Sequence, residues 1–237
     1  MRVNNVGMGL MSKKESRLFD EWPDQYDRWF ETPLGKVVKA CEQDLIMELL
    51  TPIEGETMLD AGCGTGMFTH DFLFSGASVV GLDLSLPMLR KAVRRYHLLP
   101  FRPIVGDMTR LPFKDESFDK TVSITALEFI EDVKGAVMEL FRVTKTGGTV
   151  VVATLNSLSP WARQRRDEAT RRETIFSKAF FRSPEEILAL VSFPGTAKTV
   201  VHFPKDAEPE MALLREGEGR KKALDTGAFV AARWLKP

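Results

Sequence analysis

The sequence is poor in cysteine, has no net charge and contains no long hydrophobic run. Its two cysteines, Cys41 and Cys63, are too few for a disulfide framework and lack the spacing of a metal site, which indicates a reducing compartment. The 33 basic and 33 acidic residues cancel, so no global field recruits nucleic acid, although this does not exclude a local basic patch. No apolar stretch approaches the roughly 20 residues of a membrane span, and the first residues lack the apolar core of a signal peptide. The composition therefore favours a cytoplasmic protein without a membrane span.

Length and polarity predict one folded domain. The chain has 237 residues, of which 43% are hydrophobic, enough for one α/β domain with a small appendage. Residues 1–17 are polar, rich in small side chains and without periodicity, so we expect a mobile leader there. Residues 18–237 are expected to form the single domain.

A glycine-rich stretch organises the chain. A short apolar run ends at Asp60 and is followed by glycines at alternate positions, Gly62, Gly64 and Gly66. Residues 67–75 carry apolar side chains at helical spacing, so the pattern predicts a strand, a tight loop and a helix. Glycines let a ligand lie against the main chain, and the N-terminus of a helix leaves N–H groups unpaired. The stretch therefore predicts a nucleotide-type pocket.

The spacing of these glycines is wrong for a dinucleotide cofactor. The fingerprint G-x-G-x-x-G requires a third glycine at position 67, where the sequence has Met67. An NAD-type oxidoreductase is therefore a disfavoured alternative.

A second acid follows the next predicted strand. Residues 78–83 form an apolar run that ends at Asp83, and Ser85 then opens a helix-start pattern. Asp83 lies 19 residues after Gly64, a separation at which one strand-helix-strand unit brings an acid beside the glycine loop. A carboxylate there accepts hydrogen bonds from ribose hydroxyls, whereas the alternative role, N-cap of the next helix, suits Ser85 better. We therefore expect Asp83 to bind a ligand.

The later strands repeat this arrangement of an apolar run followed by polar residues. Asp107 lies at the end of one of them, and the last two are expected to pair antiparallel across an intervening polar segment. Acids at the carboxyl ends of parallel strands share the edge at which open α/β sheets bind ligands. The remaining predicted strands are residues 101–108, 118–125, 145–154, 196–203 and 227–234.

Several segments, in the correct order, resemble the class I S-adenosylmethionine (SAM) dependent methyltransferases of the small-molecule, type 11-like branch. The stretch Asp60-x-Gly62-x-Gly64-x-Gly66 resembles their first motif. The run Gly106-Asp-Met-x-x-Leu-Pro-Phe-x-x-x-x-Phe-Asp is similar to their adenine-binding segment.

The resemblance implies a fold and a cofactor. The expected fold is a doubly wound α/β domain with a seven-stranded, mostly parallel, Rossmann-like sheet. Residues 18–50 are expected to form an N-terminal helical lid, and residues 155–195 a helical segment on the acceptor side. The implied cofactor is SAM, with S-adenosylhomocysteine as its product.

The resemblance also implies individual cofactor contacts. Tyr26 matches a tyrosine that folds over SAM, Asp107 the acid that accepts the exocyclic amine of adenine, and Met108 the side chain that lies on its ring. The expected cofactor-binding residues are Tyr26, Asp60, Ala61, Gly62, Cys63, Gly64, Gly66, Asp83, Leu84, Met88, Asp107, Met108 and Ile124.

An aromatic-dense segment at residues 19–30 is hard to leave exposed in water. It either seals the edge of the core or forms a lid over the pocket, and we favour the lid. The arginines between positions 163 and 172 have two equally favoured interpretations. They form one wall of the acceptor pocket, or they lie on a solvated helix face, which the interleaved acids would favour. The expected substrate pocket consists of Trp29, Phe129, Trp161 and Arg165.

No histidine can be assigned as a catalytic base. Phe129 stands where many small-molecule methyltransferases of this group carry histidine, and the three histidines of the chain are isolated. We expect catalysis by positioning and desolvation of the two reactants, with Glu128 or Tyr26 as the candidate base if one is needed. We expect no metal.

The expected reaction is transfer of a methyl group from SAM to a small-molecule acceptor. An aromatic lid suits a closed pocket better than an open groove for nucleic acid. Residues 123–126 lack the Asn-Pro-Pro-aromatic motif, which argues against the branch that methylates amino groups of DNA and protein glutamine. The remaining alternatives are an RNA methyltransferase of the same fold and a SAM-binding module without turnover.

Overall fold

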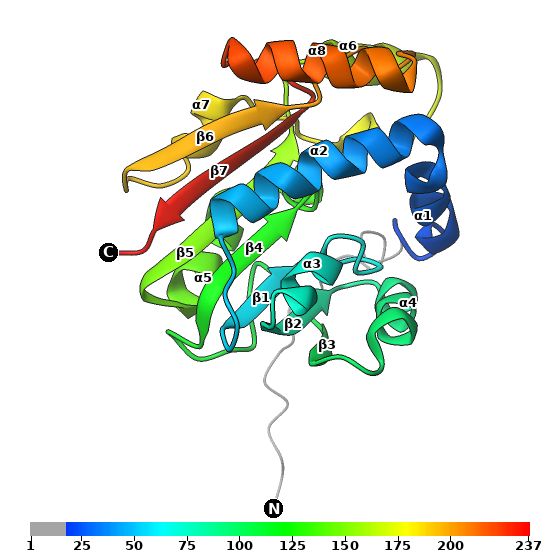
Figure 1. Ribbon diagram of the computed structural model, residues 1–237. Coiled ribbons are helices and arrows are strands. Elements are labelled where there is room, and N and C mark those ends of the chain that lie inside the picture. The colour runs from blue at the N-terminus through cyan, green and yellow to red at the C-terminus, as the bar shows by residue number, and fades with distance from the viewer. Residues whose placement is uncertain (1–17) are drawn as a thin grey trace, which may run out of the picture.

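The computed structural model describes residues 18–237, and a seven-stranded sheet forms their centre (Figure 1). The strand order is β3-β2-β1-β4-β5-β7-β6. The first five strands of this order pair in parallel, and β7 pairs antiparallel with both β5 and β6. This confirms the mostly parallel sheet and the terminal antiparallel pair. The strands are β1 (Thr57–Ala61), β2 (Ser78–Asp83), β3 (Phe101–Val105), β4 (Phe118–Ile124), β5 (Thr144–Leu155), β6 (Gly195–Val200) and β7 (Phe229–Leu235).

Helices cover both faces of this sheet, as a doubly wound fold requires. Two short 3-10 helices, η1 (Leu127–Phe129) and η2 (Ile175–Lys178), follow β4 and α6. The α-helices are α1 (Pro23–Glu31), α2 (Pro33–Leu50), α3 (Thr69–Phe74), α4 (Leu86–Tyr96), α5 (Val133–Val143), α6 (Pro160–Arg171), α7 (Pro184–Leu188) and α8 (Pro209–Lys221).

Alternating strand residues face two separate hydrophobic cores. In β1, Met58 packs into one core and Leu59 into the other, and in β5 Val151 and Val150 divide in the same way. The first core also holds buried side chains of α2, α3, α6 and α8, and the second those of α5 and α7. The helix α2 crosses the first face of the sheet (Figure 1) and is therefore part of the core.

Side chains cap the N-termini of helices at positions where the sequence predicts a helix start. At the start of α4, the backbone N–H of Met88 donates a hydrogen bond to Ser85 Oγ over 3.4 Å. At the start of α7, Ser183 and Glu186 form a capping box. These contacts satisfy N–H groups that have no partner inside the helix.

Two helices differ from the sequence-based expectation. The helix expected at residues 67–75 is shorter, because α3 begins only at Thr69. The polar segment between the last two strands contains α8, which the sequence pattern did not predict. Its buried residues, Ala212, Glu216 and Gly219, are small or charged, so the sequence of this helix shows no apolar stripe from which it could be predicted.

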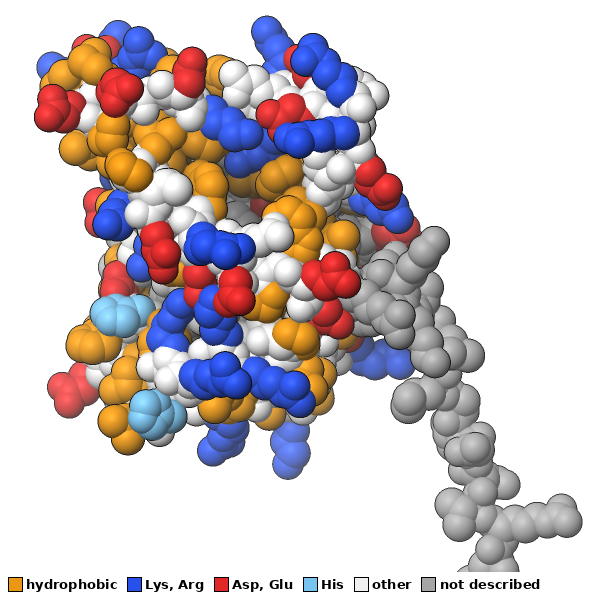
Figure 2. All heavy atoms as spheres, turned by 90° about the vertical axis from the view of Figure 1, so that its right-hand side faces the viewer, with side chains coloured by type: hydrophobic (Ala, Val, Ile, Leu, Met, Phe, Trp, Pro, Cys, Tyr) orange, Lys and Arg blue, Asp and Glu red, His pale blue; other side chains and the backbone are white. Residues whose placement is uncertain are grey.

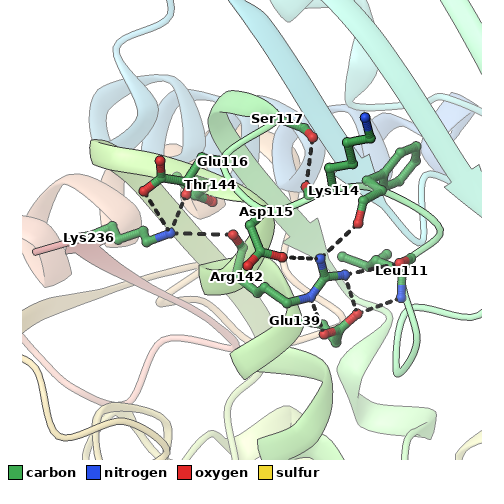
Figure 3. A network of polar contacts seen from close by, with 10 residues as sticks. Leu111, Lys114, Asp115, Glu116, Ser117, Glu139, Arg142, Thr144 and Lys236 are labelled. Atoms are coloured by element: carbon green, nitrogen blue, oxygen red, sulfur yellow. Dashed lines mark hydrogen bonds and ion pairs between the residues drawn. The ribbon is translucent and has the colours of Figure 1, made fainter.

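A network around Arg142 holds the loop between β3 and β4 (Figure 3). Its guanidinium donates hydrogen bonds to both carboxylate oxygens of Glu139, to the carboxylate of Asp115 and to the carbonyl oxygens of Leu111 and Phe113, over 2.6 to 3.0 Å. The backbone N–H of Leu111 also donates to Glu139. The loop that follows Asp107 and Met108 is thereby fixed to α5.

We expect Arg142→Met to destabilise the protein by roughly 3 kcal/mol, because it removes the donors of several charge-assisted hydrogen bonds. Urea unfolding followed by circular dichroism measures the change. Arg102→Met, at an exposed position of β3, is the control and should stay within about 0.5 kcal/mol of the parent. Equal effects of the two substitutions would contradict the role of Arg142.

Candidate functional site

A cavity of about 750 Å³ opens at the carboxyl ends of β1, β2 and β4. Its volume falls within the roughly 300 to 1,000 Å³ of small-molecule and cofactor pockets. Its wall is built from the glycine loop, the residues after β2, residues 106–110, the end of β4, the chain leading into α1, and residues 177–180. Figure 2 faces this side of the molecule and shows hydrophobic side chains bordering a hollow between groups of basic ones.

The glycine loop presents its main chain to the cavity at Gly64. This residue has a φ of +54°, and a Cβ placed there would meet no atom of the described residues within 4 Å. A Cβ at Gly62 would lie 2.4 Å from the Cβ of Ala126, and one at Gly66 would lie 2.6 Å from the Tyr96 ring. Gly62 and Gly66 are therefore required by packing, whereas Gly64 leaves space for a ligand.

Asp83 ties the glycine loop to the end of β2. Its Oδ2 accepts a hydrogen bond from the Gly64 N–H, and its Oδ1 accepts one from the Ser85 N–H, each over 2.8 Å. Ser85, and not Asp83, caps α4. Each carboxylate oxygen has a second lone pair, so Asp83 keeps the capacity to accept from ribose hydroxyls. The neighbouring Leu84 and Met88 also line the cavity.

Asp60 is a buried acid in the floor of the cavity. Its Oδ2 accepts a hydrogen bond from Thr69 Oγ1 over 2.7 Å. Burial raises its pKa to about 7, an effect that the hydrogen bond from Thr69 opposes. A positively charged ligand group beside Asp60 would favour its ionised form. Cys63 also lines the cavity, whereas Ala61 is buried and Gly66 lies behind the loop, both outside the wall.

Asp107 and Met108 form the opposite side of the cavity. Asp107 Oδ1 accepts two hydrogen bonds from Thr109, one from the backbone N–H and one from the hydroxyl, each over 2.8 Å. Because both contacts use Oδ1, Oδ2 is available to accept from an exocyclic amine. Met108 and Ile124 are buried and line the same cavity. This arrangement fits a nucleoside between Asp83 and Asp107.

The chain before α2 covers the cavity. Leu18, Phe19 and Tyr26 line it, and the Phe19 ring packs edge-on against Phe129 with centroids 4.8 Å apart. The carboxylate of Asp20 accepts a hydrogen bond from Ser85 Oγ over 2.7 Å. Of the helical lid expected at residues 18–50, only the part up to α1 lies over the cavity, because α2 packs on the sheet.

Asp27 anchors α1 to the rest of the domain. This buried carboxylate accepts hydrogen bonds from Thr65 Oγ1 in the glycine loop and from Arg95 in α4, each over 2.7 Å. Lys91 lies 3.0 Å from its Oδ2. The helix α1 and the glycine loop are therefore joined through the side chain of Asp27.

We expect Asp27→Ala to destabilise the protein by roughly 2 kcal/mol, because it leaves Thr65 and Arg95 without their common partner. Amide hydrogen exchange in α1 should become at least about tenfold faster. Asp24→Ala is the matched control, since Asp24 also contacts Lys91 but is exposed, and it should change neither measurement appreciably. Unchanged exchange in α1 of the Asp27 variant would show that the lid is held by other contacts.

Only some of the residues expected in the substrate pocket and in catalysis line the cavity. Phe129 and Tyr26 line the cavity, whereas Trp29, Trp161, Arg165 and Glu128 are outside its wall. Trp29 is partly exposed and packs against Phe30, and Trp161 is buried in the core with its Nε1 donating to the Phe203 carbonyl over 2.6 Å.

Glu128 is fully buried, and its Oε1 accepts a hydrogen bond from the Leu155 N–H over 2.8 Å. Burial raises the pKa values of Glu128 and Tyr26, so both tend to keep their protons.

Residues 177–180 line the cavity. They belong to the segment 155–195 that was expected on the acceptor side, but none of them was predicted individually. They belong to η2 and the turn after it, and they are brought to the cavity by the packing of the preceding helix. Thr125 and Ala126 were also missed individually, although Thr125 ends a predicted strand and Ala126 directly follows it. Proximity to the end of β4 was the signal that could have found them.

Within residues 18–237, no group of three or more His, Cys, Asp or Glu residues is arranged to hold a metal ion. Nor is any helix of these residues long and apolar enough to cross a membrane.

Comparison with known proteins gives consistent results. Residues 59–152 match the family described as "Methyltransferase domain". The chain is 35% identical over 227 residues to a demethylmenaquinone methyltransferase of Streptomyces avermitilis, and the match covers 90% of each protein. It is 38% identical over 119 residues to a malonyl-acyl-carrier-protein O-methyltransferase of Erwinia billingiae, which covers 50% of this chain and 46% of the relative.

A crystal structure from Thermotoga maritima has a similar fold. It is described as a SAM-dependent methyltransferase, possible histamine N-methyltransferase, and it superposes with a TM-score of 0.71 at 24% identity. The superposition covers 94% of this chain and 100% of that structure. Because the sequence similarity extends along almost the whole of a relative and the fold agrees, this chain belongs to the class I SAM-dependent methyltransferases.

Proposed function

We propose that this enzyme transfers the methyl group of SAM to a small-molecule acceptor enclosed beneath α1. The observation that carries the proposal is the cover over the cavity, where Phe19 packs on Phe129 and Tyr26 lines the interior. A covered, partly aromatic cavity excludes water from a small acceptor, whereas a polymer requires an open groove. The relatives named as acting on demethylmenaquinone and on malonyl-acyl-carrier protein support the same class.

The residues around the cavity fit SAM. We propose that Asp83 accepts from its ribose, that Asp107 and Met108 hold its adenine, and that the main chain at Gly64 lies against it. Asp60 would oppose the positive charge of the ligand, which favours the ionised carboxylate. When bound, SAM supplies a methyl group on a sulfonium, activated for displacement by an acceptor lone pair.

We propose that the protein accelerates this transfer by positioning and desolvation rather than through a dedicated base. The raised pKa of Tyr26 keeps its phenol protonated at neutral pH, so it donates a hydrogen bond instead of removing a proton. Glu128 is separated from the cavity and already accepts from the Leu155 N–H. Holding two reactants in line is itself worth about 7 kcal/mol or more of the barrier in favourable cases.

An RNA acceptor is the second candidate, because α6 exposes several arginines. Arg163, Arg166, Arg171 and Arg172 are exposed, although Glu168 lies within ion-pair distance of Arg172. If these arginines bound phosphates, affinity for RNA would fall steeply with salt concentration.

For location, we propose the cytoplasm, since both cysteines are unpaired in the fold.

The test is to supply radiolabelled SAM with a metabolite extract and, separately, with total RNA. We expect label in small molecules, together with formation of S-adenosylhomocysteine. Label confined to RNA, and lost in the double variant Arg163→Met and Arg166→Met, would overturn the small-molecule proposal. Tight SAM binding with no product from either source would instead favour a SAM-binding module without turnover.

A further inference from the structure

A buried arginine without polar partners lies beside the cavity. Arg165 of α6 is only 8% exposed, and its Nε and Nη1 atoms have no hydrogen-bond partner among residues 18–237. Its guanidinium lies between two aromatic rings, 5.3 Å from the centroid of Trp161 and 4.9 Å from that of Phe176. The aromatic faces attract the cation but leave its hydrogen-bond donors unsatisfied.

Two buried acids are near Arg165, but neither forms an ion pair with it in the described structure. Glu42 of α2 is 6% exposed, and Glu128 of η1 is fully buried with its Oε2 atom unpartnered in the part of the chain that is described. Both act electrostatically on Arg165. Burying an unsatisfied charge is strongly unfavourable, so this cluster does not exist for stability alone.

The cluster adjoins the acceptor end of the cavity. Phe176, which stacks on Arg165, precedes residues 177–180 of the cavity wall. The backbone N–H of Phe180 donates to the carbonyl of Glu128 over 2.8 Å, and Phe129, the residue after Glu128, also lines the cavity. Tyr26, which lines the cavity, is also close enough to Glu42 and Glu128 to be affected by their charges.

The charge balance of the cluster favours an anionic ligand. Burial raises the pKa of Glu42 to about 8, so this acid keeps its proton at neutral pH. Arg182 adds a second positive charge close to Glu128. With Glu128 ionised, Arg165 and Arg182 face one buried carboxylate. Glu168 and Glu186 also act on these arginines, but they are partly or fully exposed, so their charges are screened by water.

We propose that Arg165, held between Trp161 and Phe176, binds an anionic oxygen group of the methyl acceptor, a carboxylate or a phosphate. The acceptor is then an acid whose anion is anchored beside α6 while its methylated atom faces SAM. Glu42 and Glu128 border this subsite and exclude a second anion. This inference rests on the proposed small-molecule function and adds the chemical class of the acceptor.

The test uses simple aromatic probes on the full-length enzyme saturated with S-adenosylhomocysteine. Ligand-observed NMR gives the affinities of benzoate, phenyl phosphate and neutral benzamide. We expect at least one anion to bind about tenfold more tightly than benzamide, and the better of the two distinguishes a carboxylate from a phosphate. No preference for either anion over benzamide would overturn the proposal.

Arg165→Met should abolish the anion preference and leave the affinity for S-adenosylhomocysteine unchanged. It should also raise the melting temperature of the ligand-free protein, because an unpartnered buried charge is replaced by an apolar side chain of similar length. Arg163→Met, at an exposed position of the same helix, should behave as the parent. A lower melting temperature with the anion preference retained would assign Arg165 a structural role only and contradict the subsite.

Arg165→Lys provides a second variant that keeps the charge, and it should retain part of the anion preference. If it binds anions no better than Arg165→Met does, simple charge is not the determinant, and the proposal requires the guanidinium geometry. The radiolabel experiment remains independent of these measurements. Methylated small molecules without anion selectivity would refute the subsite alone, whereas label confined to RNA would refute the proposed function.

Discussion

Gly64→Val is expected to reduce SAM affinity at least about 100-fold while the protein stays folded. No atom of residues 18–237 lies within 4 Å of the position that a Cβ would take at Gly64, so the branched side chain would project into the cavity rather than into the core. The substitution also strains the backbone, because Gly64 has a φ of +54°. Isothermal titration calorimetry with SAM and thermal unfolding measure the two effects separately.

Gly147→Val is the control for strain. Gly147 has a φ of +76°, also with no atom within 4 Å of an added Cβ, and it lies in β5 away from the cavity. We expect a similar loss of melting temperature in both variants but a loss of SAM affinity only at Gly64. Unchanged affinity in folded Gly64→Val would show that the glycine loop does not contact the cofactor.

Asp83→Ala is expected to lower SAM affinity at least tenfold, since a charged acceptor of hydrogen bonds is worth about 1.5 to 3 kcal/mol for each bond. It also leaves the Gly64 and Ser85 N–H groups without the acceptor that they have in the parent. Stability should therefore fall by about 1 to 3 kcal/mol in the same variant.

Asp83→Asn separates these two roles. The amide oxygen can accept from the Gly64 N–H and keep the loop in place, but the amide nitrogen cannot accept from the Ser85 N–H, and the charge that favours ribose hydroxyls is lost. We expect part of the stability to return and the affinity to stay reduced. A variant pair in which melting temperature falls while SAM affinity does not would assign Asp83 to the structure of the loop alone.

The fold could be predicted from the sequence because its signals are local. The strand-loop-helix pattern around Gly64, the apolar runs that end at Asp83 and Asp107, and the cap at Ser85 depend on neighbouring residues. Parallel pairing with right-handed connections then leaves few topologies, and the observed sheet is one of them. Residues near strand ends were therefore placed at one edge of the sheet by general rules.

The acceptor side could not be predicted in this way, because burial of a helix residue depends on what packs against it. Trp161 and Arg165 stand among exposed arginines in the sequence. They are enclosed only by tertiary contacts, of Trp161 with Phe203 and of Arg165 with Phe176 in η2. Residues 177–180 reach the cavity through the packing of η2 against α6, although Ser177 comes 111 residues after Gly66, the last glycine of the loop.

The sequence by itself determined the family, the sheet and the acids at the strand ends, since periodicity, glycine spacing and motif order are properties of short segments. The tertiary structure decided which aromatic residues cover the cavity, that α2 belongs to the core, and that Arg165 is buried with its Nε and Nη1 atoms unpartnered among the described residues. These features arise from contacts between segments far apart in the chain, and no short stretch of sequence carries the information that specifies them.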